Sequence, residues 1–573
     1  MKNIVITAAL ALLFLIACSS GPTEDERFIK MADNFLQEFL KLNPEYATYL
    51  GDHRYDHLVS DMSPEGIKKS TDFYRATLDS LSVLNVSKLS TTNQIDYGIL
   101  KSKLESWIFQ MEEIREHEWN PLNYNVGNLI YPLLARDFAP LTERLKSVKG
   151  RLEAVPNYLQ QAKSNLSNSP RVHVETAILQ NPGSIILVRE QLNQVLEQAP
   201  EMEEELAPIQ QAAIEALEQY GDWLENELLP SANGEFRLGE EKYRKKLRYT
   251  LASDLSKEEI LASALSDLET TTDELYETAL PLYKELISDQ EAQIDDKSVV
   301  IKAVLDKLAQ DHPTNETIVS YAAETLKSTT AFVREQNLVT VPDEPVKIIV
   351  MPEFQRGVAV AYCDSPGPLE KGGETFYAIS PTPASWSEER VQSFFREYNN
   401  YMIENLTVHE AMPGHYLQIA HSNKFEAPTK IRAIFYSGPF VEGWATYSEQ
   451  LMVEHGYGGP EVKMQQLKMR LRLLINAIID QKIHTEGMTE QEAMDLMMNQ
   501  GFQEEGEAAG KWRRACMTST QLSTYYVGNL EVNDIRAAYE EKYGPDIDYQ
   551  KMHDEMLSYG SPPAKYVKKL MGL

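Results

Sequence analysis

The sequence has little cysteine. Its 573 residues include only three, and beyond Cys18 only Cys363 and Cys516 remain. Two cysteines are too few for a disulfide scaffold. They could form one disulfide in an exported protein, but the sequence does not show that they meet. A hydrophobic content of 43% and a charged content of 25% are typical of a soluble globular protein with a large core.

Basic residues are also in short supply. Lys and Arg number 55 against 86 Asp and Glu, so the formal net charge is −31. The acidic residues are spread along the chain rather than gathered in a tail, which indicates a contribution to solubility. Nucleic acid is excluded as a partner, because its phosphates require Lys and Arg.

The apolar run at the start of the chain is short. Residues 4–17 follow Lys2 and cannot span a bilayer as a mature helix, so residues 1–17 are predicted to be a secretory signal peptide. The run ends in Leu-Ile-Ala before Cys18, a pattern that resembles a bacterial lipobox. We expect Cys18 to be lipidated, with residues 18–26 as a polar tether in the cell envelope, facing the periplasm. By resemblance to bacterial lipoproteins, a serine after the lipidated cysteine, here Ser19, implies sorting to the outer membrane. The alternative is an ordinary signal peptide with a chance cysteine.

Helical periodicity dominates the rest of the sequence. Apolar residues recur at helical spacing over 28–40, 206–229, 258–286 and 318–336, and again from 388 nearly to the end. Packing of these apolar side chains into a hydrophobic core explains the pattern. Small and turn-forming residues at 231–234 predict a boundary between an N-terminal helical lobe (27–230) and a catalytic lobe (231–573).

One region, residues 346–381, has the pattern of β-strands. Short apolar runs at 347–351, 358–362 and 375–379 are separated by turn residues. The predicted fold is therefore mainly α with one small antiparallel sheet. An exposed edge strand could bind a peptide, with Tyr377 as a substrate contact, or the sheet could only pack on a helix.

The densest chemical signal is HEAMPGH at residues 409–415. Imidazole is a good zinc ligand, and a carboxylate beside the metal can act as a general base. In the usual H-E-x-x-H signature the histidines are four apart on one helix face. His409 and His415 are six apart, about 240° around a regular helix. Pro413 and Gly414 could bend the chain enough to bring the rings together. The alternative is a helix that ends at Pro413 and leaves two unrelated histidines.

A third metal ligand is expected downstream. Glu442 and Glu449 are seven apart and share a helix face. One could ligate the metal while the other supports a histidine. Gly443 permits close backbone approach beside Glu442, so we predict Glu442 as the ligand and Glu449 as the support.

Several other residues could serve a reaction. His484 follows Asp480 by four positions, so Asp480 could orient its ring. Tyr525 could donate a hydrogen bond to a developing oxyanion. Arg356 and Arg514 could bind a substrate carboxylate. Each signal is weak alone, because a lone His or Tyr on a helix is more often a core residue.

Together these residues carry a family resemblance. The chain is identified as a member of the bacterial domain of unknown function 885 family, on motifs that run nearly from end to end: LNPEYAT (42–48), LGDHRY (50–55), RGVAVAY (356–362), PGP (366–368), REYN (396–399), HEAMPGHYLQ (409–418), EGWATYSE (442–449), NAIIDQKIH (476–484), GFQEEGE (501–507) and QLSTYYVG (521–528).

This family resembles helix-rich, two-lobed zinc peptidases of the gluzincin type, such as neurolysin and carboxypeptidase Taq. The resemblance implies Zn²⁺ held by His409, His415 and Glu442, with Glu410 as the base and Tyr525 and His484 as stabilisers. Two extra residues before His415 depart from the pattern of those peptidases.

The sequence thus predicts a zinc-dependent hydrolase of peptide bonds in the bacterial cell envelope, of oligopeptidase, carboxypeptidase or dipeptidase type. Two alternatives stay open: a metal-dependent amidase or esterase of a non-peptide substrate, and a non-catalytic peptide-binding lipoprotein. The expected partners are a peptide or small amide and, through the lipid anchor alone, a membrane.

Overall fold

The structure is a computed structural model that describes residues 21–287, 296–351, 360–370, 372–384 and 386–573. The predicted signal peptide, Cys18 and Arg356 lie outside these residues. Among the described helices, none has both the length and the apolar character that crossing a membrane requires.

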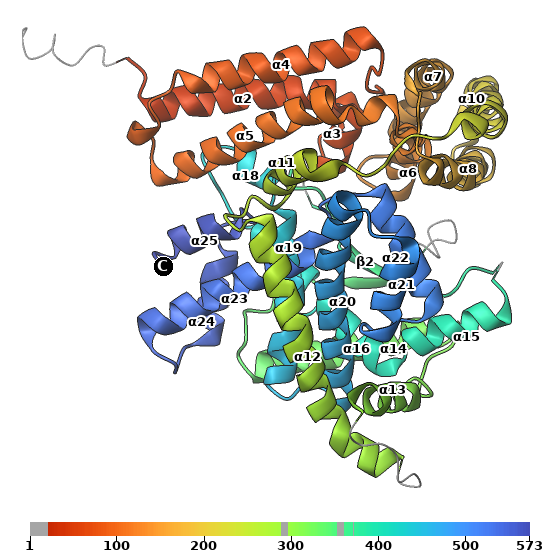
Figure 1. Cartoon of the computed structure of the whole chain (residues 1–573). Helices are drawn as coiled ribbons and strands as arrows, with labels where there is room; N and C mark the ends of the chain where they lie inside the picture. The colour runs from red at the N-terminus through yellow and green to blue at the C-terminus, as the bar shows by residue number, and fades with distance from the viewer. Residues whose placement is uncertain (1–20, 288–295, 352–359, 371, 385) are drawn as a thin grey trace, which may run out of the picture.

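The first helices form a layer along the upper edge of the molecule in Figure 1. The chain enters it through a capping box, in which Thr23 and Glu26 satisfy each other's backbone N–H groups. Stacked aromatic rings, including Phe35, Phe39 and Trp107, fill the layer's interior. Its helices are α2 (Glu24–Leu42), α3 (Pro44–Leu50), α4 (Pro64–Ser82) and α5 (Thr91–Phe109).

A second group of helices has its own apolar core, beside the first at the upper right of Figure 1. It comprises α6 (Gly127–Ala135), α7 (Leu141–Asn165), α8 (Arg171–Ile186), α9 (Leu192–Leu196) and α10 (Glu203–Trp223). The apolar contacts of this core run to Ala232, and those of the next core begin at Phe236. The predicted lobe boundary at 230/231 stays a prediction.

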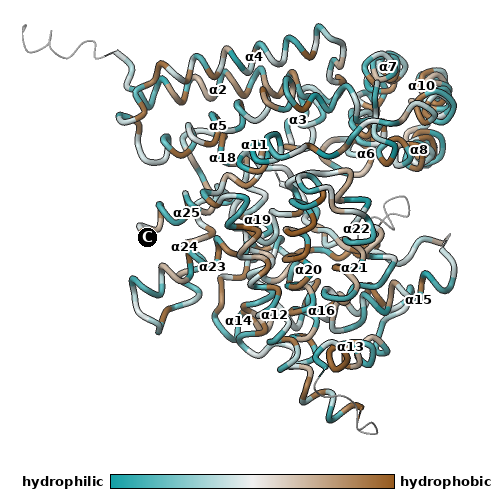
Figure 2. Tube along the Cα trace, viewed as in Figure 1, coloured by the Kyte–Doolittle hydropathy of each residue, from teal (hydrophilic) through white to brown (hydrophobic). Residues whose placement is uncertain are grey.

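The third group surrounds α20 (Gly459–Glu486), whose residues are buried on almost every side because helices pack all around it. Figure 2 shows α20 as one of the browner, more hydrophobic helices. The other helices of this group are α11 (Gly239–Leu251), α12 (Lys257–Leu286), α13 (Lys297–Leu308), α21 (Glu490–Asn499), α22 (Glu505–Met517) and α23 (Ser523–Tyr543). α13 packs on α12, and the rest contact α20 directly.

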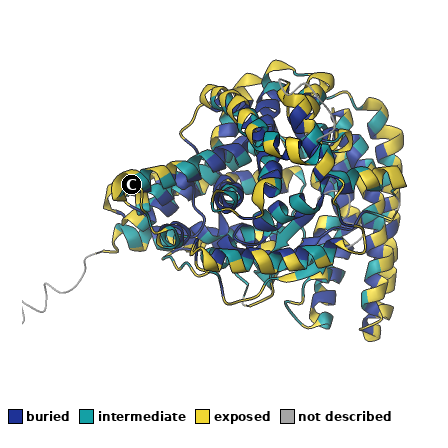
Figure 3. Cartoon of the chain, turned by 90° about the horizontal axis from the view of Figure 1, so that it is seen from below, coloured by how far each residue is buried: buried dark blue, intermediate teal, exposed yellow. Residues whose placement is uncertain are grey.

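The last group combines helices with the sheet. In Figure 3 buried residues, in dark blue, lie in the interior of the molecule, and exposed residues, in yellow, lie on the outward helix faces. The helices are α14 (Ile318–Glu335), α15 (Glu388–Glu397), α16 (Asn400–Glu410), α17 (His415–Ser422), α19 (Gly438–Glu454), α24 (Tyr549–Leu557) and α25 (Ala564–Leu570).

The sheet has the order β1-β3-β2 and is mixed. Its strands are β1 (Lys347–Val350), β2 (Ala361–Asp364) and β3 (Phe376–Ile379). β2 and β3 are antiparallel as predicted, but β1 runs parallel to β3. The prediction was wrong on this pair because β1 adds to the far side of β3 instead of joining its neighbour in sequence. Apolar runs reveal strands but not their pairing order.

Segments of the C-terminal half complete the N-terminal layer. The short helix α18 (Ile431–Ile434) packs into the core of α2 to α5. There Arg432 forms an ion pair with Asp96, and both side chains are buried. After β2, Ser365 accepts a hydrogen bond from Arg136, and Glu370 meets His53 at 2.9 Å. These contacts tie the strand region to the N-terminal helices.

Candidate metal centre

The chain bends between the two histidines of the 409–415 motif. α16 ends at Glu410, the Met412–Pro413 peptide bond is cis, and α17 begins at His415. A Cβ on Gly414 would lie 1.9 Å from the carbonyl oxygen of His409, so only glycine fits here. The two imidazole rings end up 4.7 Å apart between centroids and nearly perpendicular. The predicted bend is present, and it brings both rings to one place.

Glu442 meets both histidines. Its Oε2 atom lies 3.6 Å from Nε2 of His409 and 3.6 Å from Nε2 of His415. One donor atom from each residue falls within 4.8 Å of the others, so the group could hold a metal ion. Two ligand atoms about 2.0–2.1 Å from a tetrahedral zinc lie roughly 3.4 Å apart, so these spacings suit zinc.

The carboxyl oxygen of Glu442 that faces the histidines is buried and has no hydrogen-bond partner within the described part of the chain. A buried polar atom without a partner is costly, and a cation would satisfy it. Burial raises the pKa of the Glu442 carboxyl, but His409 and His415 outweigh burial and hold that pKa well below its usual range. The pocket therefore favours a carboxylate facing positive charge, as a metal site does.

The ring of His409 is held on its Nδ1 side, away from Glu442. Its Nδ1 atom lies 2.7 Å from Oε1 of Glu449, which is buried. Asn405 donates a hydrogen bond of 2.7 Å to the other oxygen of Glu449. This arrangement turns Nε2 of His409 toward Glu442. Glu449 stands where the support residue was predicted. Asn405 was missed, although it lies four residues before His409 and so on the same helix face.

Glu410 lies between the metal group and the sheet. The backbone N–H of Cys363, in β2, donates a 3.1 Å hydrogen bond to Oε2 of Glu410. Among the described strands β2 pairs with β3 alone, and its other edge faces this carboxylate. The sequence predicted the strand and the glutamate but gave no sign of this contact, because it joins residues 47 positions apart.

Tyr525 and Arg514 form a pair close to the same region. Arg514 donates hydrogen bonds to the Tyr525 hydroxyl at 3.0 Å and to Gln521 at 2.8 Å. α19 and α23 cross where Gly443 touches Gly528, since a Cβ on Gly443 would lie 2.3 Å from Gly528. Glu442 is next to this crossing, and Tyr525 is one helical turn before it.

His484 and Asp480 have other partners. Nε2 of His484 lies 3.0 and 2.8 Å from the carbonyl oxygens of Ala515 and Thr518, at the end of α22. Asp480 accepts the backbone N–H groups of Thr520 and Ser523, at the start of α23. These are the contacts of buried structural residues. They do not support the catalytic role predicted for His484 or the orienting role predicted for Asp480.

Two predicted substrate contacts also fall elsewhere. The Tyr377 side chain has no exposed surface, and its hydroxyl lies 3.1 Å from that of Thr407 beneath α16. A substrate contact does not fit this position, because Tyr377 is on the face of β3 that packs on the helix. Arg356 lies outside the described residues. Cys363 and Cys516 are free thiols rather than a disulfide.

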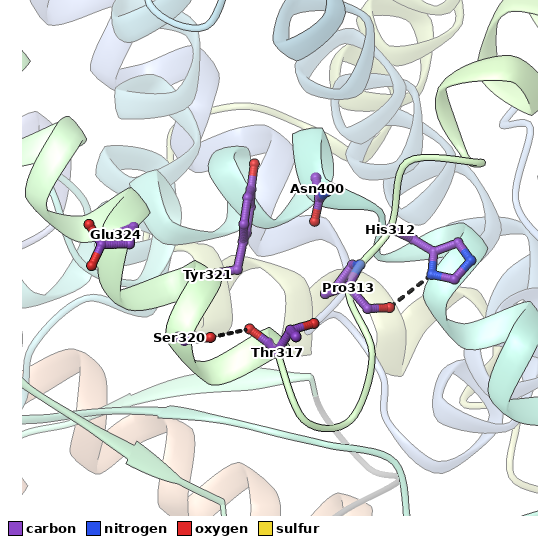
Figure 4. A pocket seen from close by; sticks show the side chains of 7 residues that line it. All are labelled: His312, Pro313, Thr317, Ser320, Tyr321, Glu324 and Asn400. Carbon is purple, nitrogen blue, oxygen red and sulfur yellow. Dashed lines mark hydrogen bonds between the residues drawn. The ribbon is translucent and has the colours of Figure 1, made fainter.

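A separate surface pocket of about 300 Å³ lies near the start of α16 (Figure 4). Its lining includes His312, Tyr321 and Asn400 but no member of the metal group. Asn400 and His409 are nine residues apart on one helix, which is roughly 13 Å. The metal group is the candidate functional site, because only there do ligand-type side chains converge within the described residues.

Comparisons with known proteins are consistent with this fold. A Shewanella oneidensis protein, described as a lipoprotein of unknown function, is 31% identical, with a TM-score of 0.82 over 95% of this chain and 100% of its own. A Colwellia psychrerythraea lipoprotein is 18% identical, with a TM-score of 0.76 over 96% and 99%. The M32 carboxypeptidase of Deinococcus radiodurans R1 is 11% identical over 96% and 94%, with a TM-score of 0.38, too low for an inference. No curated protein matches the chain.

The family relationship is direct. A family model matches residues 44–571, which include the metal group and every motif after residue 43. The chain belongs to the family described as bacterial protein of unknown function (DUF885).

Proposed function

We propose that this protein is a zinc-dependent peptidase of the bacterial cell envelope. The observation that carries the proposal is the position of Glu442 Oε2, buried and at equal distance from Nε2 of His409 and of His415. These three residues would hold the ion. When bound, zinc supplies a Lewis acid that activates water and polarises a carbonyl group.

Glu410 is the proposed general base. It directly follows the ligand His409 at the end of α16, and its carboxylate faces β2. The N–H of Cys363 binds one oxygen, and the other makes no hydrogen bond within the described residues. The free oxygen would take the proton of the attacking water and pass it to the leaving nitrogen.

Tyr525 is the proposed oxyanion donor. Its hydroxyl oxygen accepts N–H groups from Arg514 and, at 3.5 Å, from Gln521. A hydroxyl that accepts from two donors keeps its own proton for a third partner. That proton would stabilise the negative oxygen that develops during hydrolysis.

The edge of β2 that faces away from β3 favours a peptide over other amides. An extended peptide can add to an edge strand through its main chain, and Glu410 lies against this edge. A metal-dependent amidase or esterase would use the same centre on a non-peptide substrate. A peptide-binding lipoprotein would keep the edge and lack turnover.

Purified protein with one equivalent of zinc, incubated with a short-peptide library and followed by mass spectrometry, tests the proposal. Glu410→Gln should lower turnover by about 10²- to 10⁴-fold and leave bound zinc unchanged. Glu426→Gln, an exposed glutamate without contacts among the described residues, is the matched control and should keep full activity. Undiminished turnover in Glu410→Gln would remove this residue from the mechanism. Bound zinc without hydrolysis of any peptide, amide or ester would favour the binding protein.

The proposed localisation is at a membrane of the cell envelope, through a lipid anchor at Cys18. The two relatives of high structural similarity are both described as lipoproteins, which supports it. Replacement of Cys18 by Ser should move the protein from the membrane fraction to the soluble fraction of lysed cells. Membrane retention of the Cys18→Ser protein would rule out this anchor.

A further inference from the structure

Lys511, in α22, is a buried lysine without a partner. Its side chain is 8% exposed, and it makes no hydrogen bond or ion pair with any described residue. Burial holds its pKa well below the usual range, and the nearby cations of Arg472 and Arg514 lower it further. An unpaired buried ammonium group destabilises a protein, so a position that keeps one needs a reason.

The charges around Lys511 do not balance. Lys468 and Arg472 face two carboxylates: Lys468 lies 2.9 Å from Glu397, and Arg472 pairs with Glu507. Lys511 and Arg514 have no carboxylate within ion-pair distance among the described residues. Two cations are thus left over in a chain whose net charge is −31. An anion from outside the chain would supply the missing partner.

The unpaired cations lie next to the proposed reaction site. Lys511 and Arg514 are three positions apart on α22 and therefore share a face. Arg514 binds the hydroxyl of Tyr525, which is one turn from the crossing that places Glu442.

We propose that Lys511 and Arg514 form a subsite for the carboxylate at the C-terminal end of a peptide, so that hydrolysis removes residues from that end. This rests on the proposed peptidase function. One nitrogen of Arg514, Nη2, donates to Tyr525 and Gln521. The remaining N–H groups of Arg514 and the ammonium group of Lys511 can each donate to one oxygen of a carboxylate.

Binding without turnover tests this subsite. The zinc-loaded Glu410→Gln protein is titrated by calorimetry with N-acetyl-trialanine, with its C-terminal amide, and with an amide peptide that ends in aspartate. The free acid should bind at least 10-fold more tightly than the simple amide. Lys511→Met should weaken binding of the acid by roughly 30-fold, the effect of removing one partner from a buried charge pair, and leave the amide unchanged.

Arg513→Met is the matched control. Arg513 is the exposed neighbour on the same helix, so its removal subtracts one cation without touching the subsite. Acid binding should stay within twofold. Lys511→Met should also melt at a higher temperature, because it removes an unpaired buried charge. Should that variant fail to fold, Arg514→Met measures the same loss from a half-buried position.

Three results would overturn the proposal. Equal binding of acid and amide would exclude a carboxylate subsite. Equal binding of the acid and the aspartyl amide would assign the site to an acidic side chain rather than a chain end. Unchanged acid binding in Lys511→Met would leave the lysine with a structural role only. None of these results depends on hydrolysis, so they stay distinct from a failure of the peptidase function.

Discussion

Two groups of histidines and carboxylates lie in the C-terminal half of the chain, and they use their polar atoms differently. At the half-buried metal centre, His409 and His415 both point Nε2 at Oε2 of Glu442, with 3.6 Å between the atoms, and that oxygen has no hydrogen-bond partner among the described residues. In the second group, His484 meets two backbone carbonyls, and Asp480 accepts backbone N–H groups at the start of α23. The same residue types therefore serve as candidate metal ligands in one group and as links between helices in the other. What separates them is whether the polar atoms already have partners.

The largest effect is expected from a substitution that removes a ligand from the metal centre and leaves the second group intact. Glu442→Ala should reduce bound zinc from one ion per chain to none, and hydrolysis should fall on the order of 1000-fold, because Lewis-acid stabilisation is worth several kcal/mol. His484→Gln should keep its zinc. Elemental analysis after dialysis measures both variants. Loss of zinc from His484→Gln with retention in Glu442→Ala would reverse the assignment of the two groups.

A smaller effect is expected from the residue behind the ligand. Glu449→Gln should weaken zinc binding by about 10- to 100-fold, since the carboxylate fixes the ring of His409 and increases its basicity. Asp480→Asn is the matched change in the second group and should leave zinc affinity unchanged while lowering the melting temperature. Competition with a chelator gives the affinities. An equal zinc affinity in Glu449→Gln and the unchanged protein would show that the contact at 2.7 Å is structural.

Much of the fold followed from local patterns. Helical periodicity located most of the helices, and turn residues separate the three strands. α2 begins at Glu24, inside the stretch predicted as a tether, because Thr23 and Glu26 form a capping box there. The pairing of β1 with β3 could not be predicted, because it depends on which edge of a finished strand is free. The same holds for α18, whose few apolar residues gave no sign that they complete the N-terminal layer.

The site was predictable where backbone constraints fix it. Pro413 and Gly414 indicated the bend through their residue types alone, and Gly443 indicated the close approach whose partner is Gly528. Tyr377 and His484 were misplaced for a shared reason. A tyrosine or a histidine near a motif has the same sequence signal whether its polar atom faces a cleft or a neighbouring helix. Lys511 was missed because a single lysine on a helix is usually solvated. Its burial close to other cations, which distinguishes it, is visible only in the structure.

The smallest expected effect concerns His173, in α8, which lies near His484 and belongs with the structural group. Burial lowers the pKa of His173 to about 4, against 6.5 as its ordinary value, and the nearby Glu116 carboxyl opposes this only in part. Between these two values the unfolded chain binds the proton and the folded protein does not, so stability should fall as the pH falls. At pH 5 the loss amounts to about 2 kcal/mol.

In His173→Gln this part of the acid sensitivity should vanish. His57→Gln, at an exposed position, should leave the slope of unfolding free energy against pH unchanged. Urea unfolding from pH 7 to pH 5 in saturating zinc measures the slope with the metal ligands held. A slope in His173→Gln as steep as in the unchanged protein would mean that the acid sensitivity comes from the ligand histidines, and the contrast between the two groups would then fail.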